Sequence, residues 1–252
     1  MRAAGPDAAS YLQRMLSNDV EALLPGDSCE ALLLTAKARV IATTTVWRRG
    51  VEDFLLLTEP DLAAALLDEL RRFRFAAKVD LEPEMHRSTL VLGGDPPAGA
   101  IANADYGVPA YELLDANAPE GAASIEGNAL ELLRIEARTP RMGREIDDRV
   151  LPAEAGLDER AISFTKGCYP GQEPVARLHY RGHANRGLRV LEIEGDGLPE
   201  YDAPLTDGDN VVGRVTSAVA ANGTVVALGY VRREVAEDAE LLVAGTRRAR
   251  LT

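Results

Sequence analysis

The chain has 252 residues, 46% of them hydrophobic and 27% charged, with a formal net charge of −12. This length can build a large core and more than one subdomain, and the composition is that of a globular protein. No apolar run is long enough to span a membrane, and the N-terminus lacks the apolar stretch of a secretory signal. The acidic balance argues against an extended nucleic-acid surface, because such binding requires Lys and Arg to neutralise phosphates.

The cysteines number only two, far apart and without a repeated spacing. Such usage is typical of a reducing compartment and gives no disulfide framework. We therefore expect a cytoplasmic protein with no membrane partner.

The first third of the chain predicts two helices separated by strands. Leu12, Met15 and Leu16 form the apolar stripe of a helix over Asp7–Ser17. A second helix is predicted to follow Thr58 and to run to about Phe73, since Thr58 can cap it and Pro60 suits its first turn. Strands are predicted where β-branched or apolar runs lie between turn residues, over Ala31–Leu34, Val40–Trp47, Phe54–Leu57 and, as two further strands, within Ala76–Leu92.

Arg71, Arg72 and Arg74 cluster at the end of the second helix. Basic residues there ordinarily complement the negative end of the helix dipole, and this is the role we expect for them. A third helix is predicted over Asn128–Ala137, and the adjacent carboxylates Asp147 and Asp148 are interpreted as turn residues.

After Gly187 the chain changes to short strands joined by turns. The predicted strands are Arg189–Glu194, Val211–Val219, Thr224–Val231 and Leu241–Ala244, and Asn222-Gly223 is a strong hairpin signal between two of them. This spacing predicts a small barrel or sandwich.

A segment around Cys168 carries the strongest chemical signal. Ala161–Phe164 is predicted to be a short strand, followed by a turn rich in Gly and Pro that holds the thiol. Nearby Lys166 would favour the thiolate, which is the nucleophilic form. Alternatively, Cys168 is a small buried hydrophobe, and Lys166 only braces the turn through a backbone hydrogen bond.

Four basic residues follow the thiol at every second position: Arg177, His179, Arg181 and His183. In an extended strand this spacing places all four on one face, which would suit an anionic ligand. Cys168, His179 and His183 could also be metal ligands, but structural zinc sites usually contain paired cysteines and four ligands. We therefore predict no stable metal site.

The octapeptide KGCYPGQE, which contains Cys168, resembles the signature of the YgfZ-type folate-binding proteins, relatives of the glycine-cleavage T-protein (aminomethyltransferase). GPDAASYLQRMLSNDV, LLRIEARTPRMGREIDDRVLPAEAGL and VVGRVTSAV resemble further segments of that superfamily, in the same order. The resemblance implies an α+β fold of the GcvT-like type, with several subdomains around a central folate cavity. Residues 1–186 would form the folate-binding region, as two intertwined α+β subdomains, and residues 187–252 a C-terminal β-barrel.

The resemblance also implies a function. Such a protein would bind tetrahydrofolate and support iron–sulfur enzymes, including those that modify tRNA, through the motif of Cys168. Glu136 coincides with the glutamate that contacts the pterin in the T-protein, a task that suits a carboxylate because a pterin edge offers adjacent N–H donors. Arg177 and Arg181 would bind the glutamate tail of folate, and Cys168, with Lys166, would carry out redox or one-carbon chemistry.

Two alternatives remain open. Aminomethyltransferases carry a pair of aspartates where this chain has Ala42 and Thr43, which disfavours transferase chemistry but leaves open whether the protein is an enzyme. Members of the family also usually carry a strand and an aromatic folate contact before the first helix, and we expect this chain to lack both. The second alternative is therefore a thiol- or metal-contacting partner protein that no longer binds folate.

Overall fold

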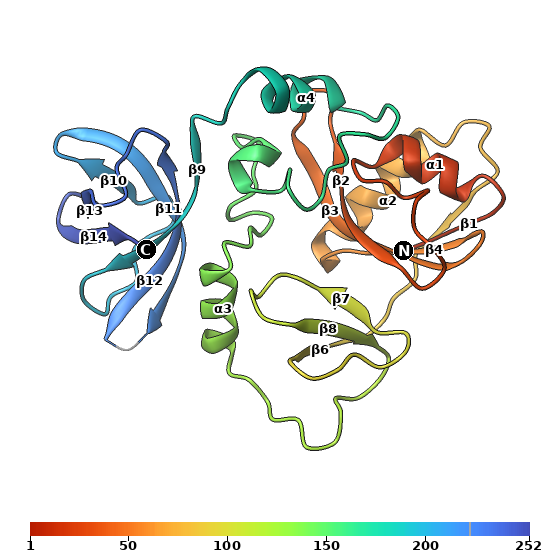
Figure 1. Ribbon diagram of the computed structural model, residues 1–252, viewed down its shortest axis with the longest axis horizontal. Coiled ribbons are helices and arrows are strands. Elements are labelled where there is room, and N and C mark those ends of the chain that lie inside the picture. The colour runs from red at the N-terminus through yellow and green to blue at the C-terminus, as the bar shows by residue number, and fades with distance from the viewer. Residues whose placement is uncertain (222) are drawn as a thin grey trace.

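The structure is a computed structural model that describes residues 1–221 and 223–252, and it contains three sheets connected by helices and loops (Figure 1). The first sheet is antiparallel, in the order β2-β3-β4-β1-β5. Its strands are β1 (Arg2–Ala4), β2 (Ser28–Leu34), β3 (Val40–Gly50), β4 (Asp53–Leu57) and β5 (Asp80–Glu82). The predictions for β2, β3 and β4 are confirmed.

Two helices cover one face of this sheet. Helix α1 (Ala8–Met15) and helix α2 (Ala63–Arg72), the latter preceded by a 3-10 turn (Pro60–Leu62), contribute Leu12, Leu66 and Leu70 to a buried core that also contains strand residues. Both predicted helices are thus confirmed. Thr58 does not cap α2, because its hydroxyl donates to the carbonyl oxygen of Thr43 at 2.7 Å.

The N-terminal residues form a strand that the sequence did not predict. β1 lies inside the sheet, with Ala3 opposite Phe54 of β4 and Leu81 of β5. The expectation that the chain lacks a strand before its first helix is therefore wrong. A strand of three residues is too short to show an alternation of apolar and polar side chains in the sequence. It is specified instead by its pairing with β4 and β5.

The second sheet has three strands, β6 (Ser88–Leu92), β7 (Ile101–Asn103) and β8 (Ala110–Leu114), in the order β6-β8-β7. It is tied to the first sheet through His86. The imidazole lies 2.6 Å from Asp115 Oδ2 and 2.8 Å from Glu84 Oε1, and Glu84 in turn accepts two hydrogen bonds from Arg49 of β3.

The hydrogen bond that His86 donates to Asp115, together with the one that it donates to Glu84, raises the pKa of His86 above 6.5. A raised folded-state pKa gives stability that is fully present below the unfolded value and is lost as pH rises through the folded one. Urea midpoints should therefore fall slightly as pH rises above 6.5, by a small amount because exposed ion pairs contribute little. The variant His86→Gln should show no such fall in this range, and an equal fall would contradict the assignment.

The third sheet is a closed barrel in the order β10-β11-β12-β9-β14-β13, which confirms the predicted C-terminal barrel. Its strands are β9 (Arg186–Ile193), β10 (Pro204–Asp207), β11 (Asn210–Ala221), β12 (Thr224–Arg232), β13 (Glu240–Val243) and β14 (Arg247–Leu251). Ala221 pairs with Thr224, as expected for a hairpin between β11 and β12. Of the predicted turn residues, Asn222 lies outside the described residues.

A buried carboxylate joins the barrel to the middle of the chain. Glu145 is 0% exposed, and its side chain accepts hydrogen bonds from Ser217 Oγ of β11 at 2.7 Å and from the backbone N–H of Arg141 at 3.0 Å. Arg134 of helix α3 (Gly127–Glu136) lies 3.2 Å from the same carboxylate and is only 2% exposed. Tyr230 of β12 donates to the carbonyl oxygen of Glu145.

The segment around Cys168 differs from its prediction in two ways. Residues 161–164 form no strand, because the backbone groups of this segment bind a loop residue after α1 and not a neighbouring strand. The N–H of Ser163 donates to Ser17 O, and Ser17 Oγ donates to Ala161 O. Residues Gln172–Arg181 form helix α4 and are not extended. A short 3-10 helix, Pro152–Ala155, lies between this helix and β9.

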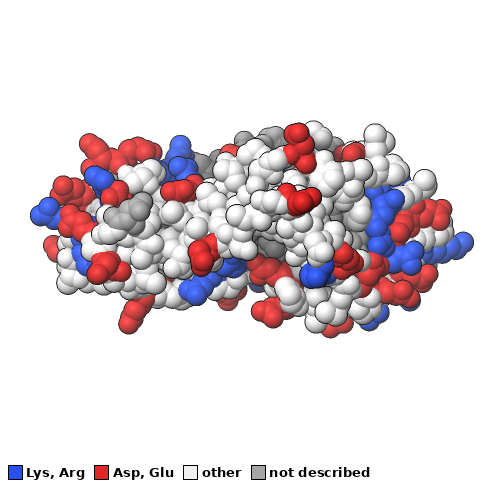
Figure 2. Space-filling view, turned by 90° about the horizontal axis from the view of Figure 1, so that it is seen from below, with Lys and Arg blue, Asp and Glu red and all other residues white. Residues whose placement is uncertain are grey.

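Charged side chains of both signs are spread over the face shown in Figure 2, with a largely uncharged area between its two ends. Within the described residues, the helices are all too short or too polar to cross a membrane.

Candidate functional site

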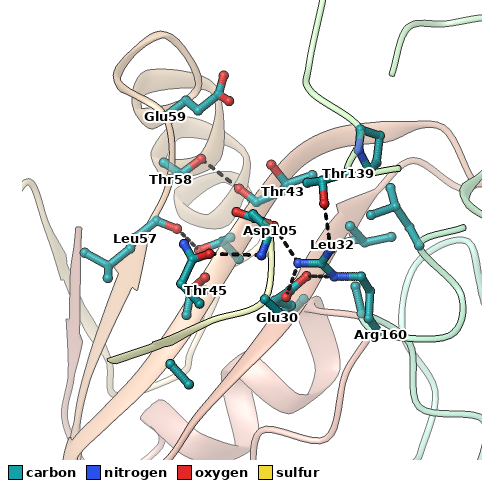
Figure 3. Close-up of a pocket in the computed structure, with 18 of the residues that line it drawn as sticks. Glu30, Leu32, Thr43, Thr45, Leu57, Thr58, Glu59, Asp105, Thr139 and Arg160 are labelled. Carbon is teal, nitrogen blue, oxygen red and sulfur yellow. Dashed lines mark hydrogen bonds and ion pairs between the residues drawn. The ribbon is translucent and has the colours of Figure 1, made fainter. Parts of the chain in front are cut away.

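A cavity of about 300 Å³ lies beside the first sheet on the face that α1 and α2 leave uncovered (Figure 3). The strand register explains its chemistry. Glu30 of β2 lies opposite Thr45 of β3, and Thr45 lies opposite Leu57 of β4, so these three side chains point to the same face. Thr43, two residues before Thr45, shares that face.

Three other parts of the chain close the cavity. Asp105 comes from the loop between β7 and β8, Thr139 from the loop after α3, and Arg160 from the segment that precedes the Cys168 loop. The cavity therefore lies where the two sheets of the N-terminal region meet the central segment, and it is predominantly polar.

Arg160 is the centre of the polar network in this cavity (Figure 3). Its guanidinium forms a bidentate pair with Glu30, with Nε 2.6 Å from Oε2, and its Nη2 also lies 2.6 Å from Asp105 Oδ1. Nη1 donates to Thr139 Oγ1 at 3.4 Å. One cation thus connects three separate segments and fixes two carboxylates in the cavity wall, since bidentate pairs are geometrically specific.

A further carboxylate of the cavity wall, that of Glu112, lies on the three-stranded sheet. Glu112 accepts hydrogen bonds from Asn103 Nδ2 at 2.9 Å and from Ser88 Oγ at 2.5 Å. Glu59 lies at the edge of the cavity distant from Arg160 and is exposed (Figure 3). A carboxylate oxygen can accept more than one hydrogen bond, so these groups can still accept from a ligand.

Lys166 lies in a different position, against the end of α1. Its ammonium donates to three backbone carbonyl oxygens, those of Gln13 at 2.5 Å, Leu16 at 2.6 Å and Asn18 at 2.8 Å. Burial lowers the pKa of Lys166 to about 8, which leaves the ammonium protonated at neutral pH. All three of its donors are used, as expected for a residue that caps a helix C-terminus. This geometry favours the bracing role of Lys166.

Cys168 is exposed on the loop between Lys166 and α4 and is not among the residues that line the cavity. The loop is held by close packing at Gly171, whose φ is +81° and whose position leaves no room for a Cβ, which would lie 2.6 Å from Thr35 O. The thiol therefore sits on an anchored loop and is open to a partner.

Of the four basic residues after Cys168, Arg177, His179 and Arg181 lie on α4 and His183 lies in the loop that follows it, so none is on a strand. Residues two apart on a helix point in different directions, so the expected single face of four basic side chains is wrong. Arg177 and Arg181, four apart, do share a side of the helix, whereas His179 stacks on Phe164 with ring centroids 3.7 Å apart.

Glu136 is the last residue of α3 and is exposed. It does not line the cavity, although Thr139, three residues later, does. Among residues 1–221 and 223–252, no group of three or more His, Cys, Asp or Glu side chains is placed to hold a metal ion.

Glu30, Asp105 and Arg160 are not among the site residues predicted from the sequence. A signal existed for Glu30, because pairing the two predicted strands in the correct register places it opposite Thr45. No local pattern indicates Arg160, whose contact with Glu30 spans 130 residues of the chain.

The structure is an α+β fold that ends in a closed six-stranded barrel. The chain is similar to the crystal structure of glycine cleavage system aminomethyltransferase T from Bartonella henselae, with a TM-score of 0.80 and 19% identity, over 98% of this chain and 80% of that one. No family model matches the chain.

Several proteins are similar to this chain in sequence. The chain is 29% identical to tRNA-modifying protein YgfZ from Pectobacterium carotovorum, over 82% of this chain and 72% of the relative. It is 29% identical to an uncharacterized protein of Haemophilus influenzae, over 88% and 81%, and 28% identical to an aminomethyltransferase of Rubrobacter xylanophilus, over 95% and 75%. These relatives and the structural neighbour together support a place for the chain in the YgfZ-type, GcvT-like superfamily.

Proposed function

We propose that this protein binds tetrahydrofolate, or a related folate, in the central cavity and supports the assembly or repair of iron–sulfur enzymes, including tRNA-modifying ones, through Cys168. The observation that carries the proposal is the polar cavity beside the first sheet. Its volume of about 300 Å³ lies at the lower end of the range of small-molecule sites. The YgfZ-type relatives are named as tRNA-modifying proteins, which supports the proposed role in tRNA modification.

The residues of the cavity fit a folate. A pterin edge presents several N–H donors, and the carboxylates of Glu30, Asp105 and Glu112 are acceptors in the wall. The hydroxyls of Thr43 and Thr45 can donate to ring nitrogens and the ring carbonyl. The bound folate would supply the one-carbon carrier, whereas this chain would bind and orient it and exclude water around it.

Four residues outside the cavity are assigned to the same ligand or reaction. Glu136 would contact the pterin from the mouth beside Thr139, and Arg177 and Arg181 would attract the anionic glutamate tail from their shared side of α4. Cys168 would carry out the redox or one-carbon step, or contact a partner's cluster, in the cytoplasm.

The test is a calorimetric titration with tetrahydrofolate of the native chain and two variants. Thr45→Phe places a ring in the cavity and should abolish binding, because the occupied volume is no longer free. Glu136→Ala should weaken binding by about tenfold to a hundredfold, the loss expected for a charged hydrogen bond. Glu126→Ala removes an exposed carboxylate beside the other end of α3 and should bind like the native chain.

Two results would count against the proposal. If the native chain shows no saturable binding, the protein is better described as a thiol-bearing partner protein that has lost its folate. If Thr45→Phe binds normally, folate does not occupy the central cavity.

A second candidate is folate-dependent aminomethyl transfer, favoured by the similarity to the Rubrobacter aminomethyltransferase over 95% of this chain. Thr43, at a position where the resemblance places an aspartate, has no carboxylate to act on a folate amine. We therefore expect no aminomethyl transfer by the native chain even when it binds tetrahydrofolate.

A further inference from the structure

An exposed cluster of arginines and aromatic rings lies at the end of α2 and belongs to no site described above. It consists of Arg71, Arg72, Phe73, Arg74 and Phe75, and we call it the arginine–phenylalanine cluster. All five residues are exposed, Phe75 to 86% and Phe73 to 38%. Large aromatic side chains are normally buried, so two adjacent exposed rings require an explanation.

The backbone holds Phe75 outward at an energetic cost. Its φ is +41°, in the left-handed region that a bulky residue rarely adopts. The ring forms an edge contact with Phe73, with centroids 6.4 Å apart and an interplanar angle of 66°, and this contact leaves most of the Phe75 ring surface open. Strained residues of this kind tend to occur at functional positions.

Arg71 and Arg72 lie in the last turn of α2, where basic residues complement the helix dipole, and two arginines of the cluster also bind outside the helix. Nη2 of Arg71 donates to Leu81 O at 2.8 Å, and Nη1 of Arg74 donates to Val79 O at 3.5 Å, so both bind carbonyls of the next segment. The carbonyl oxygen of Leu70, near the helix end, accepts from Tyr11 instead. Each guanidinium keeps further N–H donors at the surface.

Arg72 completes the pattern, because its guanidinium carbon lies 5.3 Å from the centroid of the Phe73 ring. Its side chain is 71% exposed and has one long ion pair, 3.5 Å to Glu69. The cluster therefore offers cations and ring faces within a stretch of five residues.

We propose that the arginine–phenylalanine cluster binds a short segment of single-stranded nucleic acid. Stacking of unpaired bases on aromatic side chains combined with arginine contacts to phosphates is the common basis of single-strand binding. The charge of the cluster is complementary to such a ligand, although the net charge of −12 restricts binding to this local surface. A membrane or a second copy fits less well, because three arginines accompany the two rings within five residues and like charges would face each other across a dimer.

The test measures the fluorescence anisotropy of a labelled oligouridylate RNA at about 50 mM salt, where phosphate contacts are strong. We expect Phe75→Leu to weaken binding by about tenfold or more, the loss that corresponds to one stacked base. Phe75→Tyr keeps the ring and should bind like the native chain. Met85→Ala, which removes a side chain of a residue that is 94% exposed, is the matched control and should have no effect.

Three results would overturn the proposal. The first is the absence of saturable RNA binding by the native chain. The second is equal binding of the native chain and Phe75→Leu, or of single-stranded and duplex RNA, since either would exclude stacking. The third is evidence that the cluster binds a membrane or a second copy of the chain instead of RNA. In that case Phe75→Leu would leave RNA binding unaltered but would abolish binding to phosphatidylglycerol vesicles or dissociate a dimer.

Discussion

Replacement of Arg134 by methionine should lower the free energy of unfolding by about 3–5 kcal/mol, the usual cost of leaving one member of a buried ion pair without its partner. Methionine can fill the space of the aliphatic part of the Arg134 side chain but carries no charge. Glu145 then remains fully buried without its cation. Arg134 also donates to Thr139 O at 2.6 Å, and this carbonyl would lose its donor. Urea denaturation measures the difference.

The matched control is Arg250→Met, which breaks an exposed pair with Glu192 on the barrel and should cost about 1 kcal/mol or less. The double variant Arg134→Met with Glu145→Gln should recover part of the loss, because it removes the buried charge as well. If Arg134→Met costs no more than Arg250→Met, the pair does not hold α3 and the barrel together.

Replacement of Lys166 by methionine should cost about 2–3 kcal/mol, since three carbonyl oxygens at the end of α1 would lose the donor that satisfies them. The loss should appear as a lower thermal midpoint. Cys168→Ala should leave that midpoint unchanged, because the thiol is exposed and supports no packing. The comparison separates a bracing residue from a reactive one within a single octapeptide.

The same two variants have different expected effects in cells that lack the native protein. Cys168→Ala should fail to restore iron–sulfur-dependent tRNA modification although it folds normally, whereas Lys166→Met should restore it in proportion to the folded fraction. Full restoration by Cys168→Ala would remove the thiol from the proposed function. An unchanged thermal midpoint for Lys166→Met would instead return Lys166 to a chemical role.

The sequence by itself determined those features that repeat locally. Helical spacing of apolar residues predicted α1 and α2, and β-branched runs between turns predicted β2, β3 and β4, as well as the barrel that follows Gly187. The octapeptide around Cys168 indicated the superfamily. These signals work because each depends on neighbours within a few residues, where backbone geometry fixes which side chains share a face.

The tertiary structure alone decided the site. β1 is a strand only because β4 and β5 lie on either side of it, and α4 is helical although its basic residues alternate. The cavity is formed by segments that are far apart in the chain, and Arg160 meets Glu30 across 130 residues. Contacts of this kind leave no periodic trace in the sequence, since the pairing of distant segments depends on how whole elements pack and not on the spacing of their residues.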